Sequence, residues 1–133
     1  MYSSTLASNN STNVIDQRMQ LFKQSEQSIR AIRHYIKAGE IDLAANEIEF
    51  HIQWSTEMHD YFPVGSQASV SNNSRAAGDI WNNWEKFLNY KLEYQKKAEA
   101  LKFALQLQDD GLVRQSFMDM ASVCKSCHQS FRN

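Results

Sequence analysis

The feature that most constrains this chain is the run Cys124-Lys125-Ser126-Cys127-His128, which stands almost at its C-terminal end. A Cys-x-x-Cys-His run is the attachment signature of a c-type haem. On a helix the two sulfurs lie on one face, where each can form a thioether to a porphyrin vinyl group, and the adjacent histidine can bind the iron. Because only residues 129–133 follow, any group on the opposite side of the haem has to come from an earlier part of the chain.

Three other uses of the two cysteines are weaker. A thioredoxin-like redox pair lies at a strand-to-helix junction, and no strand pattern precedes this motif. A disulfide between residues three apart on a helix has poor geometry. A structural zinc site needs a fourth ligand, which would have to come from one of three histidines without paired spacing: His34, His51 or His59. The sequence therefore predicts one covalently attached haem c, held by Cys124 and Cys127, with His128 as the ligand of the iron.

Composition favours a helical domain. The 133 residues suffice for one domain with a hydrophobic core, and four glycines and one proline leave little material for the turns of a β-protein. A net charge of −1 without a basic run argues against nucleic acid as a partner. No stretch approaches the roughly 18 apolar residues of a membrane span, so we expect no membrane insertion. No constellation of general acid, base or nucleophile indicates an enzyme.

Breaker residues divide the chain into four amphipathic segments. We expect Asn13 to cap the first helix and Gly39 to end it, Pro63 to end the second, and Asp110 to cap the fourth. The predicted helices run over 14–38, over 40–61, from 79 to the run 109–111, and from that run onwards, with a loop over 63–77.

The apolar stripe of the last segment predicts the architecture. The two cysteines continue the stripe that faces the core, so the haem has to sit between helices. We therefore predict an all-α fold, an up-down-up-down four-helix bundle with covalently bound haem near its C-terminus. Residues 1–133 form one domain in this prediction, with 1–13 as a flexible segment, and His34 and His51 lie on the surface. The stripe reads Val113, Phe117, Met120, Cys124, Cys127, Phe131.

Three blocks of sequence follow a known pattern in the right order. They are the block 117–132, which reads F-x6-C-x-x-C-H-x-x-[FY]-R, the turn Phe62-Pro63-Val64-Gly65-Ser66, and Ser74-Arg75-Ala76 followed by Ile80-Trp81. The chain thereby resembles the cytochromes c′, whose haem is attached near the C-terminus of a four-helix bundle. The resemblance implies that Arg18 lies near a haem propionate and Arg132 near the open side of His128. It also places Arg75 and Phe117 among the haem-binding residues.

The resemblance implies a particular group above the iron. In the family this residue follows the arginine of the first helix by four positions, which gives Phe22. Phenylalanine has no lone pair, so we expect a five-coordinate, high-spin iron with an apolar distal pocket. Met19 lies about 60° round the same helix, and its thioether is a possible ligand of the iron, as in the related low-spin cytochromes c-556. The resemblance also suggests His59 at the distal edge of the haem, and the alternative is a partly exposed histidine at the end of a helix.

Two functions follow from these alternatives. A five-coordinate iron with an apolar pocket admits nitric oxide and carbon monoxide and disfavours dioxygen, because no distal hydrogen-bond donor is expected. A six-coordinate iron bound by Met19 would instead suit an electron carrier. The resemblance implies both nitric oxide handling and electron transfer with an unidentified redox partner protein.

Location and assembly are expectations of the same kind. Haem attachment in bacteria takes place after export, which predicts the periplasm. Residues 1–13 have neither the basic nor the apolar region of a signal peptide, so we interpret the sequence as a mature chain. The resemblance implies a homodimer through the first and second helices, whose exposed Ile and Phe residues would suit an interface.

Overall fold

Four long helices make up the protein, as the sequence predicts. The computed structural model describes the backbone of residues 7–66 and 79–131 and the side chains of residues 13–66 and 80–131, and within these ranges it contains no strand. The 3-10 turn Met58–Tyr61 (η2) continues the second helix, and a short helix precedes the third. The helices are α1 (Ala7–Ala38), α2 (Ile41–Glu57), the short α3 (Asp79–Asn82), α4 (Trp84–Leu107) and α5 (Asp110–Phe131).

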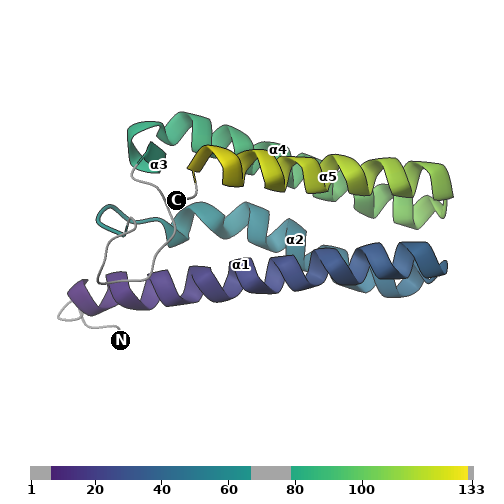
Figure 1. Ribbon diagram of the computed structural model, residues 1–133, viewed down its shortest axis with the longest axis horizontal. Coiled ribbons are helices and arrows are strands. Elements are labelled where there is room, and N and C mark those ends of the chain that lie inside the picture. The colour runs from purple at the N-terminus through teal and green to yellow at the C-terminus, as the bar shows by residue number, and fades with distance from the viewer. Residues whose placement is uncertain (1–6, 67–78, 132–133) are drawn as a thin grey trace.

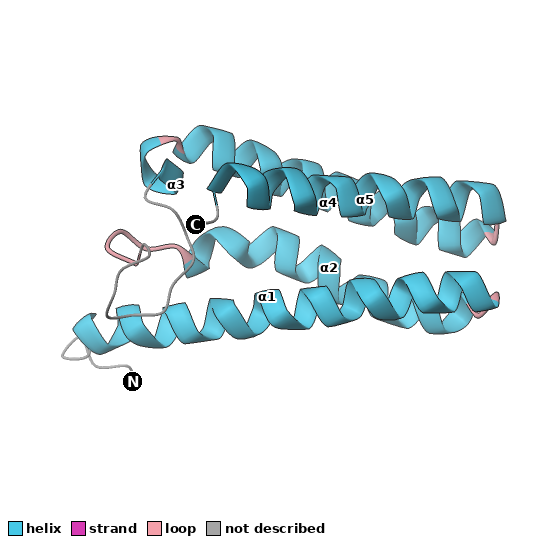
Figure 2. Ribbon diagram, in the orientation of Figure 1, coloured by secondary structure: helices cyan, strands magenta, loops and turns pink. Residues whose placement is uncertain are grey.

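The four long helices pack in a ring in which one of the four helix–helix contacts is much smaller than the others. α1 packs against α2, α2 against α4 and α4 against α5, whereas α1 and α5 touch much less. The α1–α2 and α4–α5 turns lie at one end of the bundle (Figure 1), and Figure 2 shows the long helices running side by side along its length. The α1–α5 side is therefore where a group can enter between helices. None of the described helices has the length and apolar character that a membrane span requires.

Local chemistry sets most of the helix ends. Gly39, with φ +74°, follows α1 in the left-handed region that glycine adopts without strain, as expected from the sequence. Gln108 ends α4 with φ 55°. The Oδ1 of Asp109 accepts a hydrogen bond of 3.0 Å from the backbone N–H of Leu112, so Asp109 caps α5 and the prediction of Asp110 as the cap is wrong.

Two predicted helix bounds also need correction. α1 begins at Ala7, so residues 7–13 have a helical backbone and Asn13 is not the N-cap. No Gly or Pro interrupts the segment, and a helix that is already nucleated extends readily through such residues. The predicted third helix is interrupted at Asn83, where φ −127° and ψ 49° separate α3 from α4. The predicted loop 63–77 lies for the most part outside the described residues.

The buried face of α2 differs from the predicted one. The helical period predicts one apolar face of α2 that contains Ile41, Ala45 and Ile52, but these three are only partly buried. His51, predicted on the surface, is fully buried. The polar residues on this face are hydrogen-bonded, which allows them inside. The buried side chains of α2 are Ala44, Ile48, His51, Trp54 and Ser55.

His51 connects three helices through two hydrogen bonds. Its Nδ1 lies 2.5 Å from the hydroxyl of Tyr94 on α4, and its Nε2 lies 3.0 Å from the hydroxyl of Ser28 on α1. A neutral imidazole donates a hydrogen bond through one nitrogen and accepts one through the other. The hydroxyls of Tyr94 and Ser28 can each act as donor or acceptor. Burial lowers the pKa of His51 to about 4, so the ring is neutral at neutral pH.

The stability of the fold should depend on pH through His51. In the unfolded chain this residue takes up a proton as the pH falls below about 6.5, whereas the folded protein keeps it neutral down to about 4. The unfolded state therefore binds more protons between these values, and the stabilisation present above pH ~6.5 is lost as the pH falls towards 4. We expect a loss of about 3 kcal/mol from this residue.

Denaturant unfolding at several pH values measures this effect. The His51→Asn variant does not titrate at this position, so the stability advantage of the wild type over the variant should shrink by about 3 kcal/mol between pH 7 and pH 4. A difference that is the same at both pH values would contradict a neutral, buried His51.

Candidate functional site

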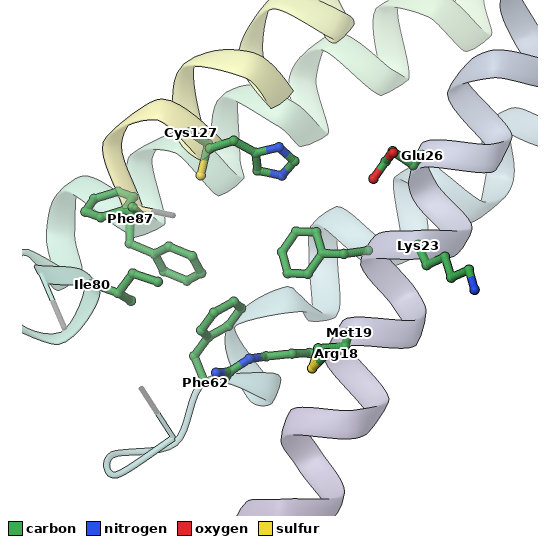
Figure 3. Close-up of a pocket in the computed structure, with 11 residues that line it drawn as sticks. Arg18, Met19, Lys23, Glu26, Phe62, Ile80, Phe87 and Cys127 are labelled. Carbon is green, nitrogen blue, oxygen red and sulfur yellow. The ribbon is translucent and has the colours of Figure 1, made fainter. Parts of the chain in front are cut away.

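A cavity of about 360 Å³ lies between α1 and α5 (Figure 3). α5 contributes Cys127 and His128 to its wall, and α1 contributes Arg18 and Phe22. In Figure 3 the carboxylate of Glu26 points across the cavity towards α5. The remaining lining residues are Met19, Lys23, Phe62, Ile80, Phe87 and Phe131.

A second cavity, of about 400 Å³, adjoins the first. The two share Phe22, Glu26, Cys127 and His128, and the second also reaches Cys124. All three residues of the attachment motif therefore border these two adjoining cavities, as the stripe on the last segment predicts. Other residues that line the second cavity include Trp54, Met58, Tyr90 and Tyr94.

Phe22 faces His128 across the opening between α1 and α5. The centroids of the two rings are 5.6 Å apart with an interplanar angle of 68°, which is an edge-on contact. The Phe22 ring also meets Trp54 edge-on at 5.3 Å. Met19 lines the first cavity too, but 38% of its surface is exposed. Of the two α1 residues considered as distal groups, Phe22 is thus the one in contact with the imidazole.

Arg18 is almost completely buried and holds α1 to the segment that follows η2. Its guanidinium donates to the carbonyl of Tyr61 at 3.1 Å and to the hydroxyl of Ser66 at 2.6 Å, and it also donates to the carbonyl of Ser66. The same group lies 4.6 Å from the centroid of the Phe62 ring. Burial lowers the pKa of Arg18 to about 10, which leaves it charged at neutral pH. Its proximity to a haem propionate stays a prediction.

The turn that accepts hydrogen bonds from Arg18 is formed by the Phe-Pro-x-Gly-Ser block, residues 62–66. Gly65 adopts φ +93°, which favours glycine, and the Ser66 hydroxyl donates to the carbonyl of Pro63 at 2.7 Å. From the other side the indole N–H of Trp81 donates to the carbonyl of Phe62 at 2.9 Å. The Phe62–Ser66 block, Trp81 and Arg18 are therefore parts of one clamp beside the first cavity.

The two cysteines are free thiols in partly buried positions. Burial raises the pKa of Cys124 to about 11, and it raises the pKa of Cys127 to about 12 with a further contribution from Cys124. Both groups are therefore protonated at neutral pH, whereas metal ligation requires the thiolate. Within the described residues no group of three or more His, Cys, Asp and Glu could hold a metal ion.

The wall of the site also carries polar groups that sequence reasoning missed. The indole nitrogen of Trp54 is buried and has no hydrogen-bond partner in the described part of the chain. Its ring packs edge-on against Phe22, with centroids 5.3 Å apart. The nitrogen itself is enclosed, so this donor does not open into the cavity, and the apolar character of the distal pocket stays a prediction. The signal in the sequence was the three-residue spacing of Ile48, His51 and Trp54, which brings them close to one face of a helix.

Two of the predicted haem-binding residues are not brought to the cavities. His59 is exposed, and its Nε2 lies 3.2 Å from the Oδ1 of Asp60. Phe117 is buried, but its ring packs under the guanidinium of Arg33 at 5.3 Å and lines a separate groove. An apolar stripe on a helix shows which residues face the core. It does not show whether a residue lies next to the cavities or further along the bundle axis. The predicted residues Arg75 and Arg132 lie outside the described residues.

Comparison with known proteins agrees with this geometry. The family described as Cytochrome C′ matches residues 13–132. The chain belongs to the cytochrome c′ family. The cofactor is accordingly haem c, and Cys124, Cys127 and His128 form the Cys-x-x-Cys-His motif that holds it. No curated protein matches the chain.

Solved cytochromes c′ share the fold at low sequence identity. A cytochrome c′ with an unusual ligand-controlled dimer dissociation is 16% identical, with a TM-score of 0.84 over 92% of this chain and 95% of the other. The protein from Thermochromatium tepidum is 18% identical, with a TM-score of 0.83 over 92% and 96% of the two chains. A nitric oxide complex of a leucine-to-alanine mutant from Alcaligenes xylosoxidans is 17% identical, with a TM-score of 0.81 over 92% and 95%.

Removal of the Arg18 clamp should weaken the fold. Arg18→Met keeps much of the side-chain volume but leaves the Tyr61 and Ser66 acceptors without their charged donor, so we expect a loss of about 3 kcal/mol in the free energy of unfolding. Ser66→Ala removes one hydroxyl only and should cost about 1 kcal/mol. Chemical denaturation measures both, and an Arg18→Met loss no larger than that of Ser66→Ala would contradict the clamp.

The attachment motif can be tested one residue at a time. The purified protein should carry one haem that stays bound after denaturation, as shown by mass spectrometry. Cys124→Ala should leave a single thioether and weaker retention. His128→Ala should keep the tether but change the iron spectrum, because the proximal ligand is removed. An unchanged spectrum in the His128 variant would identify another residue as the axial ligand.

Proposed function

We propose that this protein binds small diatomic gases, nitric oxide and carbon monoxide, at a five-coordinate, high-spin haem iron. The observation that carries the proposal is the contact between Phe22 and His128, with ring centroids 5.6 Å apart. A phenyl ring cannot ligate iron, so the sixth position stays available for a neutral diatomic molecule. When bound, haem c supplies the iron that holds this ligand.

The surrounding residues determine how easily a ligand enters. Phe22 is only half-buried, and it is enclosed by Trp54 and Phe62 at ring distances of 5.3 and 6.3 Å. A ligand has to push the Phe22 ring against these neighbours, which costs packing contacts. On the proximal side the Tyr90 hydroxyl lies 3.1 Å from that of Ser130, which ties the last turn of α5 to α4. Steric control of entry, with a fixed proximal helix, follows from this arrangement.

The solved structures support the gas-binding proposal. The Alcaligenes xylosoxidans protein of the same fold was obtained as a nitric oxide complex, with a leucine replaced. The aromatic residues around Phe22 also bear on selectivity. Trp54 and Phe62 pack on Phe22, and the indole N–H of Trp54 is itself enclosed, which supports a preference for nitric oxide and carbon monoxide over dioxygen.

A six-coordinate electron carrier is the second candidate function. It requires Met19 as the distal ligand, and Met19 does line the first cavity. Met19 would have to reach the iron past Phe22, whose ring contacts that of His128. The visible spectrum of the reduced protein distinguishes the candidates: a broad high-spin band indicates an open site, whereas sharp α and β bands indicate methionine ligation. An electron-transfer role with a redox partner protein remains compatible with the open site.

Periplasmic location and a homodimer complete the proposal. Covalent haem attachment follows export, which supports the periplasm, and one similar cytochrome c′ forms a dimer that dissociates under ligand control. The Ile and Phe residues of α1 and α2 suggested for the interface are largely packed against the core. Of the large apolar side chains exposed in the described residues, only Met19 and Leu43 lie on α1 and α2. An interface through these helices would therefore depend mainly on polar contacts.

Truncation of Phe22 should speed ligand entry. Phe22→Ala removes the ring that a diatomic molecule has to displace, so the carbon monoxide on-rate should rise by roughly tenfold or more, since ~1.4 kcal/mol of barrier corresponds to a factor of ten. Because the ring is half-buried, the loss in stability should stay below about 3 kcal/mol. Stopped-flow mixing or flash photolysis measures the rate.

Met19→Leu is the matched control, because it changes a neighbouring side chain of the same helix with little change in volume. If the iron is five-coordinate, this variant keeps both the spectrum and the on-rate. The proposal fails if Phe22→Ala leaves the carbon monoxide on-rate unchanged, or if Met19→Leu converts a low-spin spectrum into a high-spin one.

A further inference from the structure

The hydrogen-bonded pair of Tyr94 and His51 has no part in gas binding. Tyr94 is buried, lines the second cavity, and lies close enough to Cys124 for the two groups to influence each other electrostatically. Cys124 is an attachment point of the haem, so the phenol lies near the tethered edge of the cofactor. On its other side the phenol oxygen is 2.5 Å from the Nδ1 of His51. A tyrosine between a haem and a base is arranged for oxidation.

We propose that Tyr94 is a redox-active residue that is oxidised by hydrogen peroxide through the haem, with His51 as the acceptor of its proton. This inference rests on the open iron site of the proposed function, because peroxide has to reach the iron. The activity it adds is the transfer of an oxidising equivalent from the haem to a single residue of the bundle core.

The step balances in electrons and protons. One peroxide molecule takes up two electrons and leaves as two hydroxide ions; with haem bound, the ferrous iron would supply one electron and become ferric, and Tyr94 would supply the other. When Tyr94 loses its electron, its O–H bond breaks, the proton moves to Nδ1 of His51, and a neutral tyrosyl radical and an imidazolium remain. An oxidised phenol is a strong acid, so even a weakly basic imidazole takes the proton.

The surroundings of the pair favour a reversible step. His51 is fully buried and its other nitrogen is 3.0 Å from the Ser28 hydroxyl, so a proton on the ring stays next to Tyr94 and not in bulk water. Burial lowers the pKa of His51 and raises that of Tyr94, so both are neutral before the step. The proton therefore returns to the phenol when an electron is supplied again.

Two other oxidisable side chains border the same cavity but lack a base. The Tyr90 hydroxyl is 3.1 Å from the Ser130 hydroxyl, which does not take up a proton as an imidazole does. The Trp54 indole N–H has no acceptor in the part of the chain that the structure describes. Oxidation of either would leave its proton in place, which makes it less favourable. Tyr94 is thereby distinguished from Tyr90, one helical turn away on α4.

Electron paramagnetic resonance of the holoprotein, frozen within seconds of mixing with hydrogen peroxide, tests the inference. We expect a tyrosyl signal whose hyperfine structure changes when the protein is labelled with ring-deuterated tyrosine. Tyr94→Phe should abolish this signal, whereas the matched Tyr90→Phe should retain it. His51→Asn offers an amide near the Nδ1 position but no base, so the rate of tyrosyl formation should fall by roughly 100-fold.

The optical reaction of the haem with peroxide, followed in parallel, separates the two possible failures. If peroxide leaves the spectrum of the wild type unchanged, the open iron site and this inference are overturned together. If the haem reacts but no tyrosyl signal forms, or the signal persists in Tyr94→Phe, only the inference is overturned. A carbon monoxide complex with the wild-type spectrum in each variant shows that the haem pocket is intact, and an unaltered rate in His51→Asn would overturn the role of His51.

Discussion

The contact between α1 and α5 is the constraint on which the rest of this structure depends. The haem is tethered, and its iron bound, by residues of the last helix, so the opposite side of the site has to be supplied by the first helix. Phe22 and His128 meet across this seam at a ring distance of 5.6 Å. The other three helix pairs are in closer contact. Because α1 and α5 are in less contact than the other helix pairs, the cofactor and its ligands can lie between them without disrupting the core.

The position of α1 along the bundle is set by Arg18. A buried guanidinium loses its water, so it needs several acceptors, and it finds them on Tyr61 and Ser66 in the turn after η2. Trp81 also holds this turn, because its indole N–H donates a hydrogen bond to the carbonyl of Phe62. Phe22 follows Arg18 by one helical turn, and a clamp at Arg18 therefore fixes the height at which Phe22 faces the imidazole. The sequence blocks distant from the haem motif act on the site in this indirect way.

Polar groups inside the bundle give the apolar site its further chemistry. The ring of His51 is satisfied on both nitrogens, and it connects α1, α2 and α4 beneath the cavity. Among the described residues the N–H of Trp54 has no such partner. The arrangement around His51 suits movement of a proton within the protein. Both residues lie on the buried face of α2.

The sequence by itself determined the cofactor and its three attachment residues, because covalent haem binding needs fixed residue types at a fixed spacing. It also determined the class of fold, because apolar residues recur along an amphipathic helix with the period of the helix. The resemblance to the family also suggested Phe22 as the distal residue, which stays a prediction. Only the tertiary structure showed that His51 is buried in the core, that His59 is exposed, and that Phe117 packs against Arg33 and lines neither cavity. The periodicity of a helix says which side chains share a face, but the rotation and height of that face against its neighbours come from packing between helices, and this packing also decides which polar groups find partners.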